Sequence, residues 1–195
     1  MRSRVALIAA LVLLVILGPF ATRIPCFSVE GLKEVAYWIS YTQKLTSFII
    51  WVVVIAYLAT RKGINWKEVV LSAIALNVAV AALKCVFQSP RPIGVPASLC
   101  DIEGLGYPSG HSARAMWVAL WIGYLYPQLR IPALIYAFLV GWSRIELCMH
   151  YPLDVVGGFL VGFIVFEFLR GSGGGRKVEG SQAQRGGSRG SAEGS

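Results

Sequence analysis

Six apolar runs separated by short polar segments constrain this chain more than any other feature. They are Val5 to Ala21, Leu45 to Ala59, Val69 to Leu83, Ala113 to Leu129, Ile131 to Cys148 and Leu153 to Leu169. A helix needs about 20 apolar residues to cross about 30 Å of hydrocarbon, and flanking Trp and Tyr side chains extend a shorter run into the interface. With 56% hydrophobic residues, the pattern predicts an all-α integral-membrane six-helix bundle rather than a soluble globule.

The runs divide the chain into two parts. Residues 1–170 are predicted to form one six-span membrane domain, whereas the Gly/Ser-rich residues 171–195 are predicted to be a disordered cytoplasmic tail. The first run resembles a signal peptide, but Pro19 makes a poor cleavage site, so we treat it as a span. Residues 29–44 have helical apolar spacing, which fits either an amphipathic surface helix or an early start of the second span.

The positive charges are distributed as in a membrane protein. With the N-terminus inside, eleven of the 18 Lys and Arg residues fall on the cytoplasmic side: Arg2, Arg4, Arg61, Lys62, Lys67, Arg130, Arg170, Arg176, Lys177, Arg185 and Arg189. The positive-inside rule therefore predicts that both termini are cytoplasmic. We expect a multi-pass protein of the plasma membrane. The basic residues are not interleaved with aromatic residues on one face, so no nucleic-acid partner is expected.

The outer loops hold an unusual group of cations and both histidines. Lys84 ends the third run, and Arg91 follows within a stiff Ser-Pro-Arg-Pro segment. A bound anion would compensate for such cations at the membrane, and the planar fork of arginine suits phosphate. Ser109 is placed to cap the next helix, Gly110 allows close backbone approach, and His111 can protonate a leaving oxygen.

A second group of polar residues surrounds the start of the sixth run. Arg144 closes the fifth run, and His150 lies six residues after it. Asp154, four residues after His150, can reach back along the first helical turn. A carboxylate on one imidazole nitrogen fixes the tautomer and leaves the other nitrogen as a nucleophile. Taken alone, Asp154 is also explained as an acidic residue at a helix start.

These segments together resemble the type 2 phosphatidic-acid phosphatase superfamily. Eleven signature positions are filled in the right order and spacing: Lys84, Arg91, Pro92, Pro108, Ser109, Gly110, His111, Ser143, Arg144, His150 and Asp154. The resemblance implies that His150 attacks phosphorus, His111 protonates the departing oxygen and Asp154 orients His150. It also implies that a cradle holds the phosphate, made of Lys84, Arg91, Ser109, Gly110 and Arg144.

The resemblance further implies hydrolysis of a lipid phosphate or diphosphate through a phosphohistidine, with no metal and no cofactor. The expected partners are the membrane and a phosphorylated lipid, and no obligate protein partner is evident. An extracytoplasmic site suits a polyprenyl diphosphate, which we favour, a phosphatidate or a phosphatidylglycerophosphate. Arg114 lies on the same helix face as His111, where it would contact a second phosphate or lie at the interface.

Two other functions fit parts of the pattern. A vanadium-dependent haloperoxidase would use a similar anion cradle, but six apolar spans argue against that class of soluble enzyme. A non-catalytic binder or transporter of phosphorylated lipid would need the cations but not both histidines.

The four cysteines have no metal-ligand spacing. Cys26, Cys100 and Cys148 are predicted to face one compartment, either as free thiols or with one pair bridged.

Overall fold

The computed structural model describes residues 2–23, 28–94 and 98–174, and within these ranges the secondary structure is entirely helical. The elements in order are α1 (Arg2–Leu17), η1 (Gly18–Arg23), α2 (Lys33–Tyr41), α3 (Leu45–Arg61), α4 (Trp66–Phe87), α5 (Gly110–Leu125), η2 (Pro127–Leu129), α6 (Arg130–Glu146) and α7 (Pro152–Gly174). The predicted all-α class is confirmed.

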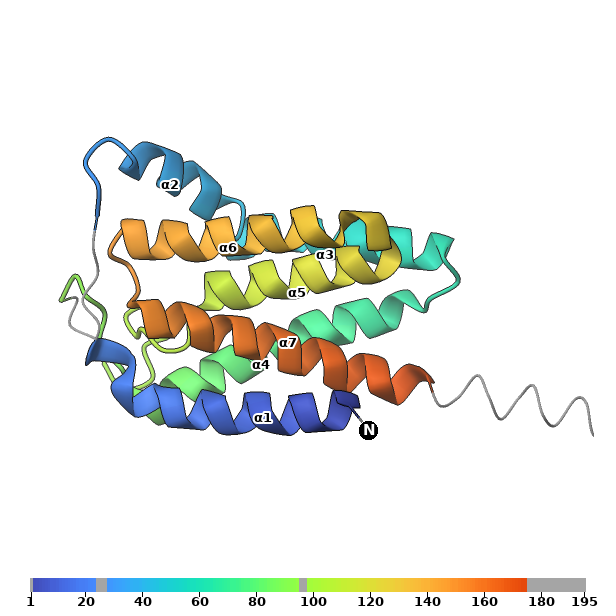
Figure 1. The fold of residues 1–195 in the computed structure, drawn as a ribbon, viewed down its shortest axis with the longest axis horizontal. Helices are drawn as coiled ribbons and strands as arrows, with labels where there is room; N and C mark the ends of the chain where they lie inside the picture. Colours follow the sequence, from blue (N-terminus) through green and yellow to red (C-terminus); the bar gives the residue numbers. More distant parts are fainter. Residues whose placement is uncertain (1, 24–27, 95–97, 175–195) are drawn as a thin grey trace, which may run out of the picture.

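Helix α5 lies at the centre of the bundle, between α6 and α7 in Figure 1. Its two tryptophans are almost fully buried, and Trp117 donates a hydrogen bond from Nε1 to Ser72 Oγ of α4 at 3.0 Å. The ring of Phe48 from α3 meets Trp117 edge to face, with centroids 5.3 Å apart. Aromatic and hydrogen-bonded contacts of this kind fix α5 within the bundle.

Small residues on α7 allow it to approach α5 closely. A Cβ atom on Gly162 would lie 2.6 Å from the carbonyl oxygen of Ala113, and one on Gly158 would collide with the carbonyl oxygen of Ser109. The two glycines are four residues apart and so lie on one helix face. Close approach through small residues is typical of helix pairs in membranes, and here it joins the beginnings of α5 and α7.

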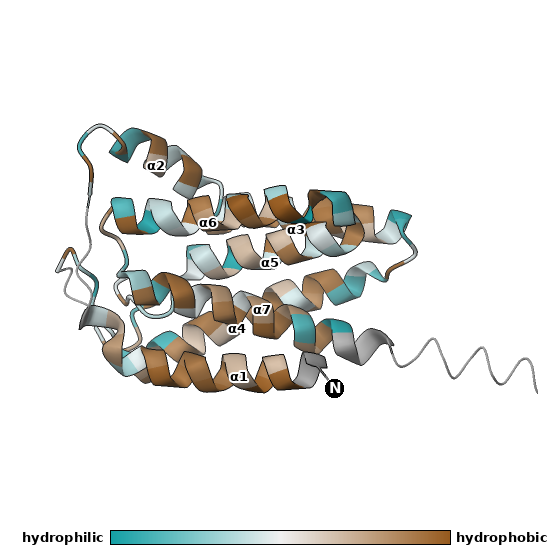
Figure 2. Cartoon of the chain, in the orientation of Figure 1, coloured by the Kyte–Doolittle hydropathy of each residue, from teal (hydrophilic) through white to brown (hydrophobic). Residues whose placement is uncertain are grey.

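The outward faces of the bundle are apolar. Large aliphatic side chains are exposed along α1 and α3, among them Val5, Ile8, Val12, Ile49, Ile50 and Val53. Figure 2 shows the same helices coloured mainly as hydrophobic. Exposed apolar surface of this extent is costly in water and is satisfied by lipid, which agrees with a membrane protein.

Fewer than six helices meet the length and composition expected of a complete span. Three candidates are present among the described residues, namely Val5–Thr22, Trp66–Phe87 and Pro152–Arg170, and α2 with α3 adds a fourth if that bent pair is one span. α5 has 16 residues and α6 has 17, so they are only about 24 to 26 Å long. Six spans therefore stay a prediction, although each apolar run lies largely within a helix.

The short helix α2 is separate from α3 and bent from it by 50°. It packs against α6 and buries Ala36 and Ser40. The described chain ends, Arg2 and Gly174, lie at one end of the bundle, and the long loop between α4 and α5 lies at the other (Figure 1). α7 continues four residues beyond residue 170, whereas residues 175–195 of the predicted tail lie outside the described residues.

Candidate active site

The loops that follow α4 and α6 bring the sequence-predicted residues to one end of the bundle, opposite the described chain ends (Figure 1). We call this group the candidate active site, and it contains Lys84, Arg91, Ser109, Gly110, His111, Arg144, His150 and Asp154. Lys84, Ser109, Gly110, Arg144, His150 and Asp154 are buried. Arg91 and His111 are partly exposed.

Lys84 and Arg91 are oriented by one backbone carbonyl. Lys84 lies in the last turn of α4, where its Nζ donates a hydrogen bond to the carbonyl oxygen of Leu105. Arg91 donates from Nε to the same oxygen at 3.3 Å. The segment between them is held by a hydrogen bond from the amide of Gly106 to the carbonyl of Ser89 at 2.7 Å. The carbonyl oxygen of Leu105 therefore holds the two cations, which come from different segments, close to each other.

The beginning of α5 has the predicted capped geometry. Ser109 has extended backbone angles, and its hydroxyl accepts from the amide of Ser112, which confirms it as the N-cap. Its own amide donates to the carbonyl of Asp154 at 2.9 Å, so the starts of α5 and α7 are joined. A Cβ on Gly110 would lie 3.1 Å from an Nη atom of Arg114. The helix N-terminus therefore lies beside His111 and a further guanidinium group.

His150 and Asp154 form the expected pair at the beginning of α7. Nδ1 of His150 lies 3.3 Å from Oδ2 of Asp154, which also accepts the amide of Tyr151 at 2.9 Å. His150 is 1% exposed and Asp154 is 0% exposed. Within the described residues Nε2 of His150 makes no hydrogen bond. The contact therefore occupies one ring nitrogen and leaves the other available for reaction.

Arg144 is tied both to His150 and to α2. Its carbonyl oxygen accepts the amides of Met149 and His150 at 3.1 and 3.2 Å, which places His150 directly beyond the end of α6. Its Nη1 donates to Ser40 Oγ at 2.5 Å, whereas the buried Nε has no hydrogen-bond partner among the described residues. A buried guanidinium with an unsatisfied N–H is poised to bind an acceptor such as a phosphate oxygen.

The surroundings of His150 favour a neutral imidazole. Burial is the largest cause that lowers the pKa of His150 well below its ordinary value, followed by the positive charges of Arg144, Lys84 and Arg91 and by His111. Burial also lowers the pKa of Arg91, while the charge of Asp154 opposes that shift. These charges act on His150 because the groups are close together in the fold. A neutral imidazole has the lone pair that a nucleophile requires.

Other contacts at this end involve Arg114 and three residues that sequence reasoning missed. Arg114, which had two interpretations, is partly buried and donates from Nη1 to the carbonyl of Gln43 at 2.7 Å. Ser40 of α2 and the carbonyl of Leu105 hold cations of the site, although nothing in their sequence context indicates this role. Tyr107 is buried and donates to the carbonyl of Leu14 at 2.5 Å. These contacts join residues far apart in the chain.

The potential metal ligands and the cysteines are the remaining residues for which the sequence supported an expectation. Among the described residues, no group of three or more His, Cys, Asp or Glu side chains is arranged to hold a metal ion. Cys148 is disulfide-bonded, whereas Cys85 and Cys100 are free. Cys26 lies outside the described residues. The sequence allowed either free thiols or one bridged pair. The interpretation as a free thiol is therefore wrong for Cys148.

The fold is similar to that of a solved membrane phosphatase. The crystal structure of a transmembrane PAP2 type phosphatidylglycerolphosphate phosphatase from Bacillus subtilis matches with a TM-score of 0.63. The match covers 88% of this chain and 96% of that chain, at 24% sequence identity. At this identity the likeness establishes the architecture, an all-helical fold of PAP2 membrane phosphatases.

Curated relatives include two lipid phosphatases. Lipid A 4′-phosphatase of Bacteroides thetaiotaomicron is 28% identical over 147 residues, which is 65% of each protein. Undecaprenyl-diphosphatase BcrC of Bacillus subtilis is 30% identical over 89 residues, or 44% of this chain and 46% of that protein. The matched part thus spans less than two thirds of the length of either relative.

The family is established by a match that covers most of the chain. The model of the PAP2 superfamily matches residues 5–171, from α1 into the last turn of α7, and so includes all residues of the candidate active site. The match agrees with the signature segments in the sequence and with the architecture of the bundle. This chain belongs to the PAP2 superfamily, and its relatives include lipid phosphatases.

Proposed function

We propose that this protein hydrolyses a phosphomonoester or diphosphate of a membrane lipid through a phosphohistidine on His150. The observation that carries the proposal is the buried His150, which faces Asp154 through Nδ1 and is surrounded by three cations. A binding site for phosphate needs the cations alone. The oriented imidazole adds a nucleophile, and so favours catalysis over binding.

In the first step, Nε2 of His150 attacks phosphorus and the bond from phosphorus to the lipid oxygen breaks. The departing oxygen takes a proton from His111, whose protonated form is favoured by the negative charge of the bound substrate. The imidazole ring of His150 then carries a positive charge in the phosphohistidine, and Asp154 stabilises this charge through Nδ1. In the second step, water attacks phosphorus, His111 removes a proton from the water, and phosphate leaves His150.

The phosphate cradle consists of Lys84, Arg91 and Arg144, together with the N-terminus of α5 at Ser109 and Gly110. A loose transition state for phosphoryl transfer spreads negative charge over the equatorial oxygens. Fixed cations and N–H groups stabilise that charge without having to reorganise during the reaction. The shared carbonyl of Leu105 fixes two of these cations in advance.

The substrate is proposed to be a lipid because the site lies at the end of a bundle with apolar outer faces. A lipid in the adjacent leaflet can present its phosphate to this end while its chains remain in the bilayer. The proposed topology has six spans, both termini in the cytoplasm and the site on the extracytoplasmic side of the plasma membrane. Among lipids we favour a polyprenyl diphosphate, which agrees with the relative named undecaprenyl-diphosphatase.

The test is phosphate release by the purified chain in detergent with EDTA present. The substrates are a polyprenyl diphosphate, phosphatidate and phosphatidylglycerophosphate, and the variants are wild type, His150→Ala and Glu146→Gln. Glu146 is a matched control because it is a buried residue at the same end whose carboxylate accepts from Val29 rather than from the site. We expect release that resists EDTA, is lost in His150→Ala and is retained in Glu146→Gln.

The same experiment separates the alternatives. Wild-type protein denatured in alkaline SDS during turnover should carry a phosphate that is stable to alkali and labile to acid, and His150→Ala should lack it. No release from any substrate by folded protein, together with retained lipid binding, would overturn the proposal in favour of a non-catalytic binder. Vanadate should inhibit release by occupying the cradle, and halide oxidation in the presence of vanadate and peroxide would indicate the haloperoxidase instead.

A further inference from the structure

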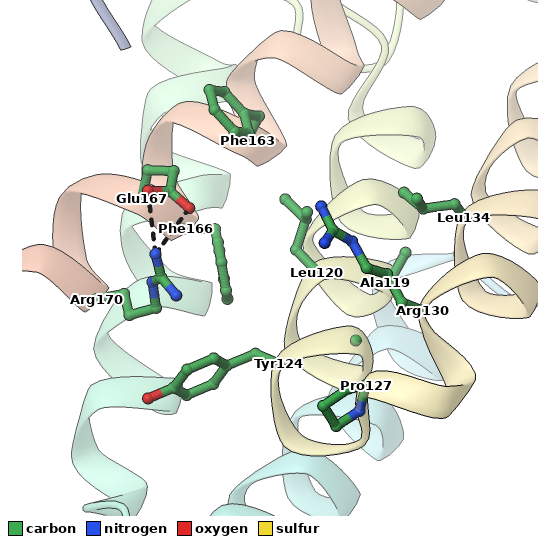
Figure 3. Close-up of a pocket in the computed structure, with 11 residues that line it drawn as sticks. Ala119, Leu120, Tyr124, Pro127, Arg130, Leu134, Phe163, Phe166, Glu167 and Arg170 are labelled. Atoms are coloured by element: carbon green, nitrogen blue, oxygen red, sulfur yellow. Dashed lines mark hydrogen bonds and ion pairs between the residues drawn. The ribbon is translucent and has the colours of Figure 1, made fainter. Parts of the chain in front are cut away.

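A cavity lies at the opposite end of the bundle from the candidate active site. It has a volume of about 410 Å³ and is formed by the ends of α5 and α7 and the beginning of α6. We call it the α5–α6–α7 pocket (Figure 3). Gly123 in this pocket is twelve residues from His111 along α5, which corresponds to about 18 Å. The proposed reaction therefore makes no use of this pocket.

Arg130 is turned into the pocket by the absence of a side chain at Gly123. A Cβ atom on Gly123 would lie 3.1 Å from Cγ and 3.2 Å from Cβ of Arg130. The arginine stem therefore lies directly on α5, and Figure 3 shows its guanidinium group pointing back along α5 toward Leu120. Arg130 is exposed, so a ligand can reach it. Within the described residues its side chain makes no hydrogen bond or ion pair.

The second arginine of the pocket is already paired. Arg170 lies 3.2 Å from Oε1 of Glu167 and also lies over the rings of Tyr124 and Phe166, at 5.2 and 5.4 Å from their centroids. The charged residues that line the pocket are thus two arginines and one glutamate, which sum to one positive charge. A phosphodiester carries one negative charge, so its charge is complementary to that of the pocket.

The two parts of the pocket differ in polarity. Leu120, Leu134 and Phe163 each lie about one helical turn nearer the middle of the bundle than the charged or aromatic residues on the same helix. The backbone positions of the charged residues therefore lie nearer the end of the bundle, and Leu120, Leu134 and Phe163 lie nearer the level of the lipid chains. The guanidinium group of Arg130 reaches inward to the place where these two parts of the pocket meet (Figure 3). A soluble anion would leave the apolar end unfilled, whereas a phospholipid is complementary to both ends.

From these observations we infer that the α5–α6–α7 pocket binds an anionic phospholipid of the leaflet opposite the candidate active site. Its phosphodiester accepts hydrogen bonds from Arg130, and its first chain segments pack against Leu120, Leu134 and Phe163. The bound lipid contacts the three helices whose other ends carry His111, Arg144 and Asp154. It therefore holds these helices together at the end remote from the reaction.

The test is lipid binding by the full chain, purified in a mild detergent and measured by native mass spectrometry. The probes are phosphatidylglycerol and phosphatidylcholine with identical chains, and glycerol phosphate as a soluble competitor. We expect wild type to retain phosphatidylglycerol preferentially, and Arg130→Gln to lower its occupancy about tenfold. Gly123→Val should lower occupancy similarly, because it displaces the stem of Arg130 while leaving the net charge unchanged.

Two controls distinguish a built site from general attraction to anionic lipid. Arg61→Gln removes a cation from the same end of the bundle that lies outside the pocket, and it should bind as wild type does. Arg130→Lys should restore part of the affinity. Equal binding by wild type and Arg130→Gln, or an equal loss in Arg61→Gln, would overturn the inference. Competition by glycerol phosphate at the lipid's own concentration would overturn the lipid as ligand and indicate a soluble anion.

Discussion

Replacement of Asp154 by asparagine tests the role of the carboxylate in the proposed reaction. The Oδ2 atom of Asp154 lies 3.3 Å from Nδ1 of His150, and both side chains are buried. Attack by Nε2 makes the imidazole ring positive, so the carboxylate stabilises the transition state more than the ground state. Asparagine keeps the size of the side chain and an acceptor for the amide of Tyr151, and it replaces the negative charge and one acceptor oxygen by a neutral NH2 group.

The magnitude follows from the geometry of this one contact. A hydrogen bond to a charged group is worth roughly 1.5–3 kcal/mol, which corresponds to roughly 10- to 140-fold in rate. The distance between Nδ1 and Oδ2 is 3.3 Å, longer than the roughly 2.7–2.9 Å of strong charge-assisted bonds. We therefore expect Asp154→Asn to lower kcat by roughly 10- to 40-fold, in the lower part of that range, with little change in KM.

The assay is steady-state phosphate release from the best lipid substrate in detergent, with Glu146→Gln as the matched change of carboxylate to amide. Glu146 accepts the amide of Val29 at 2.6 Å and therefore reports the effect of such a change on packing at this end. A kcat for Asp154→Asn within twofold of wild type would refute the reasoning, provided that His150→Ala is inactive. An equal loss in both variants would show that the effect is structural.

Three further predictions concern the site and the packing beneath it. Arg114→Gln should lower release from a lipid diphosphate about tenfold more than release from a monophosphate, because Gln43 holds this guanidinium beside the site; equal losses on the two substrates would contradict this. Burial and neighbouring cations lower the pKa of His150, so the unfolded chain binds the additional proton below about pH 6.5. The free energy of unfolding of the substrate-free protein should then fall with decreasing pH, by up to about 1.4 kcal/mol per unit, and His150→Gln should reduce this slope in thermal melts; equal slopes would count against it. Gly158→Val should cost about 1–3 kcal/mol or more because its Cβ meets the backbone of Ser109, whereas Val156→Ala, at a 38% exposed position, should change the melting temperature little; similar melting temperatures for the two variants would be evidence against close packing there.

Local patterns were sufficient to predict several features of the structure. Ser109 precedes an apolar run and is indeed the N-cap of α5, because capping depends on the adjacent backbone alone. Asp154 lies in the first turn of α7 and reaches back to His150, which precedes that helix by two residues, so the contact follows from their short separation in the chain. The break between α5 and α6 follows from Pro127, which begins η2. The chemical roles of these residues remain predictions until the variants are measured.

Contacts between distant segments were not predictable in this way. The hydroxyl of Ser40 meets Arg144 only because α2 packs against α6, and the carbonyl of Leu105 meets two cations only because the loop folds over the end of α4. Span assignment also depended on the structure, since α5 is apolar but short and is enclosed by other helices. Hydropathy does not distinguish an apolar side chain that faces lipid from one that faces protein.

The sequence by itself determined that the chain is helical, that it belongs in a membrane, and which polar residues form a phosphatase signature. Apolar runs and motif spacings are properties of neighbouring residues, so they can be read without knowledge of packing. Only the tertiary structure decided where the signature segments meet, which backbone groups hold their side chains, and that Arg130 points into the α5–α6–α7 pocket. Those features depend on how closely helices approach one another. Gly123 and Gly158 allow a close approach because they have no Cβ atom.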